Sequence, residues 1–382
     1  MPATVVRIPI TNVFMDGDYT GVLEIGSERK QANVILDTGS STLALDGKFY
    51  DPELDPDAAK TRIAQEVVYG SGQWIGAVVL TDIGIGSGSD QAVLKQVNTA
   101  VAYLESDDMF GNSNGILGLA YTQLNNAFTL PDLTWPPHYK YNQIQDGQVT
   151  YLEPYFTQLE DAGIVANRFA FYTKRSMISN ATADPASDPL NSGYMVFGGG
   201  EESTDLYSGP FQSARILDDE YYNTNLKAII VGASDPITVP PPTKGSGLTS
   251  NSIVDSGTNS LMLDQELFNT VVERFSKGYS RDLVHAMRSG YLPMSDLKLS
   301  LWPDLVFILE GDRGDARLTV RPETYWQVNA PERGQATAPL FGDNGQLGGQ
   351  SILGLPLMNG YFTIFDRSVD RGLGAIKFAA RK

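Results

Sequence analysis

Residues 34–45 read VILDTGSSTLAL, and residues 252–263 read SIVDSGTNSLML. The two stretches align without a gap: in each, an apolar run ends in Asp, a hydroxyl residue and Gly, and a second apolar run follows. They lie much further apart than the period of any solenoid repeat. The chain is therefore expected to contain two similar lobes.

Each copy predicts a buried strand that runs into a tight turn. The strand ends at Asp37 in the first copy and at Asp255 in the second, and the glycine two residues later supplies the backbone freedom for the turn. A carboxylate with little water around it needs hydrogen-bond donors. We expect the hydroxyls of Ser40 and Thr258, together with the turn amides, to be those donors.

Thr38 and Ser256 face away from the carboxylates in this interpretation and are placed to tie one loop to the other. A single Asp-x-Gly sequence is ordinary turn chemistry. Two copies with matching flanks favour one site that is built from both loops.

The duplicated pattern of two hydrophobic residues, Asp, Thr or Ser, Gly, and Ser or Thr resembles the signature of the pepsin-like aspartic proteases. The resemblance covers the chain from about Tyr19 to Phe378. It implies an all-β fold, mainly β with a few short helices. In this bilobal pepsin-like acid protease fold, two β lobes are related by a pseudo-twofold axis, and the active-site cleft lies between them.

Length and composition agree with that expectation. The 382 residues suffice for two domains that each bury a core, and 38 Gly with 21 Pro punctuate short, strand-like segments. The net charge of −17 argues against nucleic acid or an anionic membrane as a partner.

The stretch 179–192, rich in Ala, Asp, Pro and Asn, is the best candidate for a linker. We therefore expect an N-terminal lobe at 1–178 with the first Asp and a C-terminal lobe at 193–382 with the second. Residues 135–150 suggest a surface insertion, and short helices are expected at 151–163 and 265–277.

The absence of cysteine fits a reducing compartment, so a cytoplasmic location is expected. About eighteen residues precede Tyr19, too few for the family's inhibitory prosegment, which makes the chain similar to bacterial pepsin homologues. Residues 1–10 lack the apolar core of a signal peptide, and no segment approaches a membrane span. The alternative is a secreted or periplasmic protein whose signal and prosegment are absent from this sequence.

Residues 66–76, EVVYGSGQWIG, have the chemistry of a β-hairpin. By resemblance this hairpin is the flap that closes over the substrate, with Tyr69, Gly70 and Ser71 as substrate-binding residues. The family usually has Trp seven positions after the first Asp, where this chain has Ala44. Trp74, on the returning flap strand, is a candidate to replace that bulk.

The sequence Ile-Leu-Gly also occurs twice, at 116–118 and 352–354. In the family these strands cross beneath the catalytic loops, and Gly118 and Gly354 permit close approach of the backbone. Many acid-acting members have Asp after the second copy, where this chain has Leu355. The expected pH optimum therefore lies anywhere from strongly to weakly acidic.

If the lobes are related by a pseudo-twofold axis, Asp37 and Asp255 meet at the interface and share one proton. The resemblance implies an aspartic endopeptidase that activates a water molecule between them, with Asp255 as the base and Asp37 protonated at the start. It further implies no metal or other cofactor, a peptide or protein substrate, inhibition by pepstatin-like statine peptides, and a monomer.

Apolar residues near the predicted cleft suggest a preference for bulky hydrophobic side chains on both sides of the scissile bond. The candidates are Ile35 and Ile116 in the first lobe and Ile253 and Ile352 in the second, with Met109 and Phe110 as further possibilities.

Two other functions are compatible with parts of the sequence. A pepsin-fold binding or inhibitor protein would keep the fold and have weak catalysis, but both Asp loops and Tyr69 are intact. A two-carboxylate glycosidase does not explain why the Asp loops are duplicated with hydroxyls at equal offsets. The two histidines, His138 and His285, lie in no metal-ligand spacing and are expected at the surface.

Overall fold

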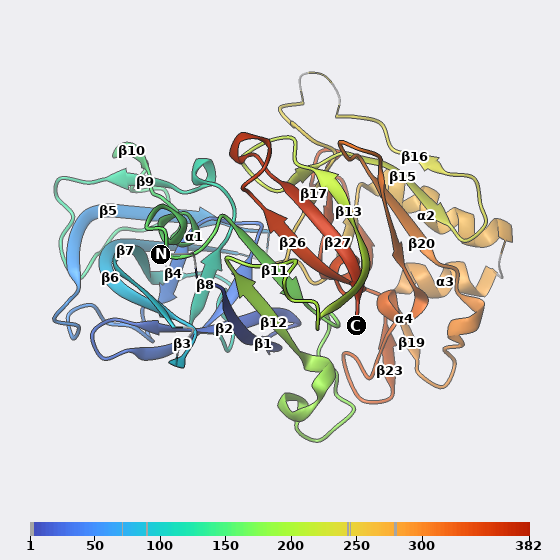
Figure 1. Cartoon of the computed structure of the whole chain (residues 1–382), viewed down its shortest axis with the longest axis horizontal. Helices are drawn as coiled ribbons and strands as arrows, with labels where there is room; N and C mark the ends of the chain where they lie inside the picture. The colour runs from blue at the N-terminus through green and yellow to red at the C-terminus, as the bar shows by residue number, and fades with distance from the viewer. Residues whose placement is uncertain (1–3, 71, 89–90, 243, 245, 279–280) are drawn as a thin grey trace.

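The computed structural model describes residues 4–70, 72–88, 91–242, 244, 246–278 and 281–382. Within these residues the chain is mostly β, as predicted, and its five α-helices are short. Figure 1 shows the N-terminal elements, in blue to teal, on one side and the orange C-terminal elements on the other. Strands β11, β12, β26 and β27 lie between them, so the protein has the expected bilobal form.

Fifteen strands form one continuous sheet in the order β10-β9-β5-β6-β7-β4-β8-β3-β2-β1-β12-β11-β26-β27-β13. Their bounds are β1 (Val6–Met15), β2 (Asp18–Ile25), β3 (Lys30–Asp37), β4 (Leu43–Asp46), β5 (Ala59–Val68), β6 (Gln73–Ile85), β7 (Ala92–Glu105), β8 (Gly115–Gly118), β9 (Asn126–Thr129), β10 (Gln148–Tyr151), β11 (Arg168–Tyr172), β12 (Ser192–Phe197), β13 (Tyr207–Arg215), β26 (Tyr361–Asp366) and β27 (Ala375–Arg381).

The second lobe contains three smaller sheets, in the orders β14-β17-β25-β18-β24, β16-β15-β20-β21 and β19-β23-β22. Their bounds are β14 (Asn223–Thr224), β15 (Leu226–Val231), β16 (Ile237–Thr238), β17 (Ser252–Val254), β18 (Leu261–Leu263), β19 (Tyr291–Pro293), β20 (Leu305–Leu309), β21 (Ala316–Val320), β22 (Gln327–Val328), β23 (Gln335–Thr337), β24 (Leu340–Gly342) and β25 (Ser351–Leu353).

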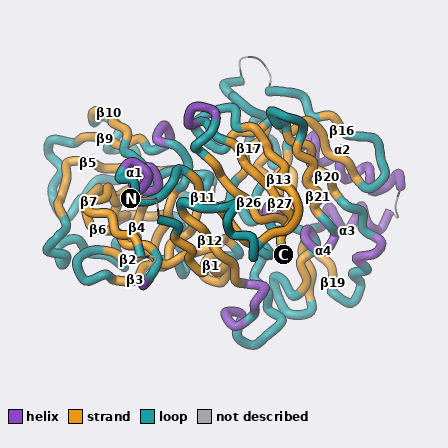
Figure 2. The backbone as a smooth tube through the Cα atoms, viewed as in Figure 1, coloured by secondary structure: helices purple, strands orange, loops and turns teal. Residues whose placement is uncertain are grey.

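The helices are α1 (Tyr155–Asp161), α2 (Gln265–Gly278), α3 (Arg281–Ser289), α4 (Pro322–Tyr325) and α5 (Leu355–Met358). Figure 2 shows α2 and α3 at the outer flank of the second lobe, away from the shared sheet. None of the described helices is long and apolar enough to cross a membrane.

The repeated sequence produces a repeated strand arrangement. In the first lobe β3 runs parallel to β8, with Asp37 opposite Gly118, and β4 runs antiparallel to β8. In the second lobe β17 runs parallel to β25, and β18 runs antiparallel to β25. Each Asp loop therefore follows a strand in the same local arrangement. This is expected if the two lobes are related by a pseudo-twofold axis.

Aromatic side chains join the lobes through the shared sheet. The ring of Phe169 on β11 stacks on Phe365 of β26 with 5.1 Å between centroids, and Tyr222 of the second lobe lies 4.6 Å from Phe365. The buried Tyr222 hydroxyl donates a hydrogen bond of 2.8 Å to the carbonyl oxygen of Leu119 in the first lobe. This packing restricts movement of one lobe against the other.

Local predictions were correct to different degrees. Helix α2 matches the predicted helix at 265–277. The helix predicted at 151–163 is shorter, because residues 148–151 pair as strand β10 and the helix begins at Tyr155, after Pro154 at the N-cap. Helix α3 was not predicted. Residues 179–192 connect β11 to β12 and contain two turns of 3-10 helix, and the lobe boundaries placed around them stay a prediction.

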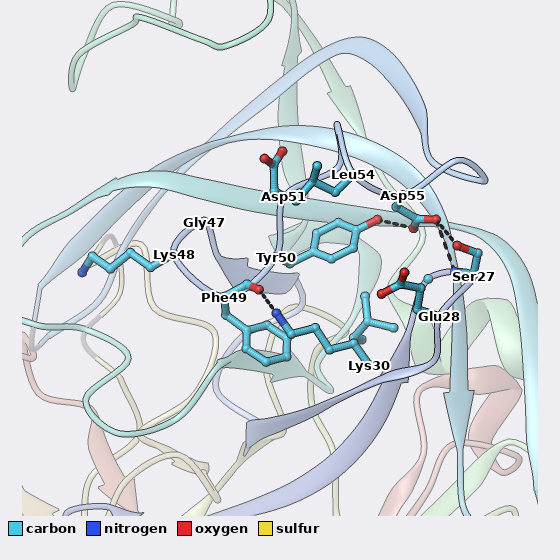
Figure 3. Close-up of a pocket in the computed structure, with 12 residues that line it drawn as sticks. Ser27, Glu28, Lys30, Gly47, Lys48, Phe49, Tyr50, Asp51, Leu54 and Asp55 are labelled. Carbon is cyan, nitrogen blue, oxygen red and sulfur yellow. Dashed lines mark hydrogen bonds between the residues drawn. The ribbon is translucent and has the colours of Figure 1, made fainter.

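A buried carboxylate organises the loop after β4. Asp55 accepts hydrogen bonds from the Tyr50 hydroxyl at 2.6 Å and from the Ser27 hydroxyl at 2.8 Å (Figure 3). The Thr81 hydroxyl donates a further bond of 2.9 Å. Burial alone raises the pKa of Asp55, but these donors outweigh it and hold the pKa at about 2.

We expect Asp55→Asn to lower the free energy of unfolding by roughly 2 kcal/mol at pH 5, because the donors lose a charged acceptor. The ionised form stabilises the fold above the unfolded-state pKa of about 4, and this contribution is lost as the pH falls through about 2. Urea unfolding at pH 5 and pH 2 should therefore show the difference from wild type shrinking at the lower pH. The exposed neighbour Asp51, changed to Asn, is the control. A difference that does not depend on pH would contradict this account.

Candidate active site

The two Asp loops meet face to face between the lobes. Asp37 is 5% exposed and Asp255 is 7% exposed. A Cβ atom added to Gly39 would lie 2.7 Å from an Asp255 carboxyl oxygen, and one added to Gly257 would lie 2.2 Å from an Asp37 carboxyl oxygen. Each loop therefore presents bare backbone to the carboxyl group of the other, and only glycine fits at these two positions.

The two carboxyl groups have matching hydrogen-bond donors. Oδ1 of each Asp accepts from the backbone N–H two residues later, at 2.7 Å for Asp37 and 2.9 Å for Asp255. Oδ2 accepts from a hydroxyl three residues later, from Ser40 at 2.5 Å and from Thr258 at 2.6 Å. Each loop thus orients its own carboxyl group.

Thr38 and Ser256 join the loops across the lobe interface. The Thr38 N–H donates to the Ser256 hydroxyl oxygen at 3.0 Å, and the Ser256 N–H donates to the Thr38 hydroxyl oxygen at 2.8 Å. The Thr38 hydroxyl donates to the Val254 carbonyl at 3.2 Å, and the Ser256 hydroxyl donates to the Leu36 carbonyl at 2.7 Å. These four buried bonds hold the two loops in one relative position.

Two glycines support the loops from below. A Cβ added to Gly118 would lie 2.4 Å from the backbone nitrogen of Ser41, and one added to Gly354 would lie 2.2 Å from the Thr258 carbonyl oxygen. Leu355, the departure from the acid-acting pattern, is fully buried and its N–H donates to the same Thr258 oxygen at 2.8 Å.

Strands β5 and β6 form a hairpin at the position predicted for the flap, and we refer to this hairpin as the flap. The Tyr69 N–H donates to the Gly72 carbonyl at 2.7 Å and closes the turn. Gly70 is exposed and a side chain there would meet no atom within 4 Å. Ser71, the third predicted flap residue, lies outside the described residues.

Trp74 packs with the residue that stands at the family's usual Trp position. Its indole is fully buried in one apolar cluster with Ala44 and Ile35, and Tyr69 packs against that cluster. Burial raises the pKa of the Tyr69 hydroxyl, and the nearby charge of Asp37 raises it further. The bulk of Trp74 thus belongs to the same apolar cluster as the small Ala44.

The apolar residues predicted to line the cleft lie opposite one another on neighbouring strands. Ile35 pairs with Ile116 across β3 and β8, and Ile253 pairs with Ile352 across β17 and β25. Phe110 belongs to the cluster of Ile35 and Ile116. The Met109 side chain lies against the flap, since a Cβ on Gly72 would come within 2.7 Å of its sulfur atom.

A cavity of about 210 Å³ opens beside the first Asp loop, under the flap. Ser40, Tyr69 and Leu124 line it from the first lobe and Tyr221 lines it from the second. Tyr221 was not predicted from the sequence, because it is brought to the cleft only by the docking of the two lobes.

Burial and the facing carboxyl group of Asp255 both act on the pKa of Asp37. Burial raises the pKa of Asp37 well above its usual range, and the charge of Asp255 raises it further. Hydrogen bonds from Ser40 and Gly39 act in the opposite direction but are smaller effects. Burial and the charge of Asp255 both favour the protonated form of Asp37. Within the described residues, no group of three or more His, Cys, Asp or Glu is arranged to hold a metal ion.

Asp18, at the start of β2, is a third carboxyl group that the sequence analysis missed. Its Oδ1 atom is buried and has no hydrogen-bond partner among the described residues. Burial is the main cause that raises the pKa of Asp18 well above its usual range. The negative charges of Asp255, Asp37 and Asp16 raise this pKa further, in decreasing order. Its place before Tyr19 was visible in the sequence, but its proximity to the carboxyl pair depends on the fold.

The comparisons with known proteins agree with this geometry. A family model described as eukaryotic aspartyl protease matches residues 18–379. The chain belongs to this family.

Among relatives of the aspartyl protease, "Pepsin A" of Gallus gallus is 22% identical over 379 residues, covering 94% of this chain and 84% of that protein. "Pepsin II-2/3" of Oryctolagus cuniculus is 23% identical over 380 residues, covering 95% of this chain and 82% of that protein. The similarity therefore includes both lobes and both Asp loops.

We expect Asp255→Asn to lower the pKa of Asp18, because removal of a nearby negative charge favours the ionised form. The titration of the carboxyl carbon of Asp18 in ¹³C NMR measures this. Asp16→Asn should give a smaller shift in the same direction, since its charge contributes least. An Asp18 titration that is the same in Asp255→Asn as in wild type would show that the two groups do not interact.

Proposed function

We propose that this aspartyl protease is an active aspartic endopeptidase, which hydrolyses peptide bonds by activating a water molecule between Asp37 and Asp255. The observation that carries the proposal is the duplicated set of donors around two carboxyl groups that face one another between the lobes. Family membership across nearly the whole chain supports the same activity.

In the proposed reaction Asp37 begins protonated and Asp255 begins ionised. The raised pKa of Asp37 supports this assignment. Asp255 takes a proton from the bound water while the water oxygen attacks the scissile carbonyl carbon, and Asp37 donates a hydrogen bond to the carbonyl oxygen. When the tetrahedral intermediate collapses, the C–N bond breaks and the amine leaves with a proton from the carboxyl pair. The reaction needs no cofactor.

We expect Asp37→Asn and Asp255→Asn each to lower kcat by at least about a thousandfold, because neither variant can share a proton between two carboxyl groups. Hydrolysis of a quenched fluorescent peptide between pH 2 and pH 7 measures this. The wild-type rate should be highest at acidic pH and should fall as the second carboxyl ionises, and a statine-type peptide should inhibit it. Asp296→Asn, at the exposed surface of the second lobe, is the control. Wild-type activity in either loop variant would contradict the proposal.

The substrate is proposed to lie in the cleft as an extended strand held by backbone hydrogen bonds, with Tyr69, Gly70 and Ser71 of the flap closing over it. The apolar side chains of Ile35 and Ile116 support binding of hydrophobic residues on one side of the scissile bond. Ile253 and the partly buried Ile352 are proposed to serve the other side.

Digestion of a mixed peptide library should therefore produce cleavage sites enriched in Phe, Leu, Tyr and Met on both sides of the broken bond. Burial of one such side chain contributes about 2 kcal/mol, which corresponds to an enrichment on the order of tenfold or more over small polar residues. Mass spectrometry of the products measures the enrichment. Cleavage sites without an apolar bias would sink this part of the proposal.

A further inference from the structure

The loop between β9 and β10, residues 130–147, lies behind the flap, and we call it the brace loop. Strand β9 pairs antiparallel with flap strand β5, with Thr129 opposite Ile63 and Phe128 opposite Ala64. The Leu130 N–H donates to the Arg62 carbonyl at 2.8 Å and extends this pairing. The loop thus begins on the sheet to which the flap itself belongs.

A small apolar core fills the space between the brace loop and the outer face of the flap. Ala64 and Ile75 contribute to it from the two flap strands. Its other buried members are Phe128, Leu130 and Ile144, and the partly buried side chains packed against it are Tyr103, Leu133, Tyr139 and Tyr141. The flap is therefore supported on the face that points away from the catalytic pair.

The brace loop also makes hydrogen bonds to both flap strands. The Asn142 N–H lies 3.0 and 2.9 Å from the two carboxylate oxygens of Glu66 on β5. The Tyr141 hydroxyl donates to the Gln73 carbonyl on β6 at 3.2 Å. Asn142 has a φ of 63°, a left-handed conformation that Asn adopts more readily than most residues. Loop and flap are thus connected near the flap tip.

At its base the loop is tied to the catalytic region through buried Asn125. The Asn125 side-chain oxygen accepts from the Thr42 hydroxyl of the first Asp loop and from the Gln65 amide of the flap, both at 2.8 Å. Its amide donates to the Leu152 carbonyl, just after β10, at 2.9 Å. The Asn125 side chain therefore joins the first Asp loop, the flap and the residue that follows β10.

We propose that the brace loop positions the flap over the catalytic pair and limits how far the flap opens, with Tyr141 and Glu66 as the positioning residues. The flap cannot lift unless it breaks the bonds to Tyr141 and Asn142 and separates from the core behind it. A lid held in this way spends more time closed, so it holds a bound peptide longer. The consequence for catalysis rests on the proposed peptidase function, whereas the consequence for flap motion does not.

Hydrogen–deuterium exchange of the flap tests the motion directly. The Ser106 N–H donates to the Gln73 carbonyl of flap strand β6 at 2.8 Å, a bond that breaks when the flap lifts. Loss of one hydrogen bond by Tyr141→Phe, or of the acceptor by Glu66→Ala, should speed exchange of the Ser106 amide about three- to tenfold. Glu66→Gln keeps an acceptor oxygen and should stay near the wild-type rate. Tyr139→Phe is the matched control, because it removes the same group from the same cluster and its hydroxyl makes no hydrogen bond within the described residues.

Peptide hydrolysis by the same variants gives a second readout. Tyr141→Phe and Glu66→Ala should raise KM about three- to tenfold and change kcat less than about twofold, because the flap holds substrate and transition state alike. Exchange and KM equal to wild type in both variants, or equally changed in Tyr139→Phe, would overturn the inference. If the wild-type protein hydrolyses no peptide, the proposed function fails, and the exchange rates alone decide whether the brace loop restrains the flap.

Discussion

Two carboxyl groups that lie side by side with little water around them cannot both carry a full charge. Most of the structure around Asp37 and Asp255 follows from this constraint. Each carboxyl needs close donors, which a glycine N–H and a hydroxyl provide. Each also needs the other lobe's loop to approach without a side chain, so glycine stands at both contact points.

The same constraint explains how firmly the two lobes are joined. A small shift of one lobe would separate the two carboxyl groups and weaken the interaction between them. The reciprocal bonds between Thr38 and Ser256 resist such a shift at the site itself. The aromatic packing of Phe169, Phe365 and Tyr222 resists it in the shared sheet.

The sequence predicts those features of the site that depend on short, continuous stretches of residues. The strand before each Asp, the glycine turn and the hydroxyl at a fixed offset are local patterns, so the sequence alone predicts both loops. The sequence suggests Trp74 as a candidate to replace a missing Trp, but only the fold shows that it shares an apolar cluster with Ala44. Asp18 and Tyr221 reach the cleft through contacts between distant segments, which no local pattern encodes.

The segment between β9 and β10 also shows that burial which depends on distant contacts is not predicted by a local pattern. Residues 135–150 are polar on average and were predicted as a surface insertion, yet Ile144 is fully buried behind the flap. Ile144 is buried because β9 pairs with β5. In this pairing Ala64 lies opposite Phe128, about sixty positions later in the chain. The composition of the loop alone does not reveal which of its few apolar side chains face the flap.

The most direct test of the central claim is a crystal structure of the protein with a statine-type peptide bound. The account predicts that the statine hydroxyl lies between the two loops, within about 3 Å of a carboxyl oxygen of both Asp37 and Asp255. A hydroxyl that contacts only one of them, or a peptide bound elsewhere, would contradict the claim that the two loops form a single site.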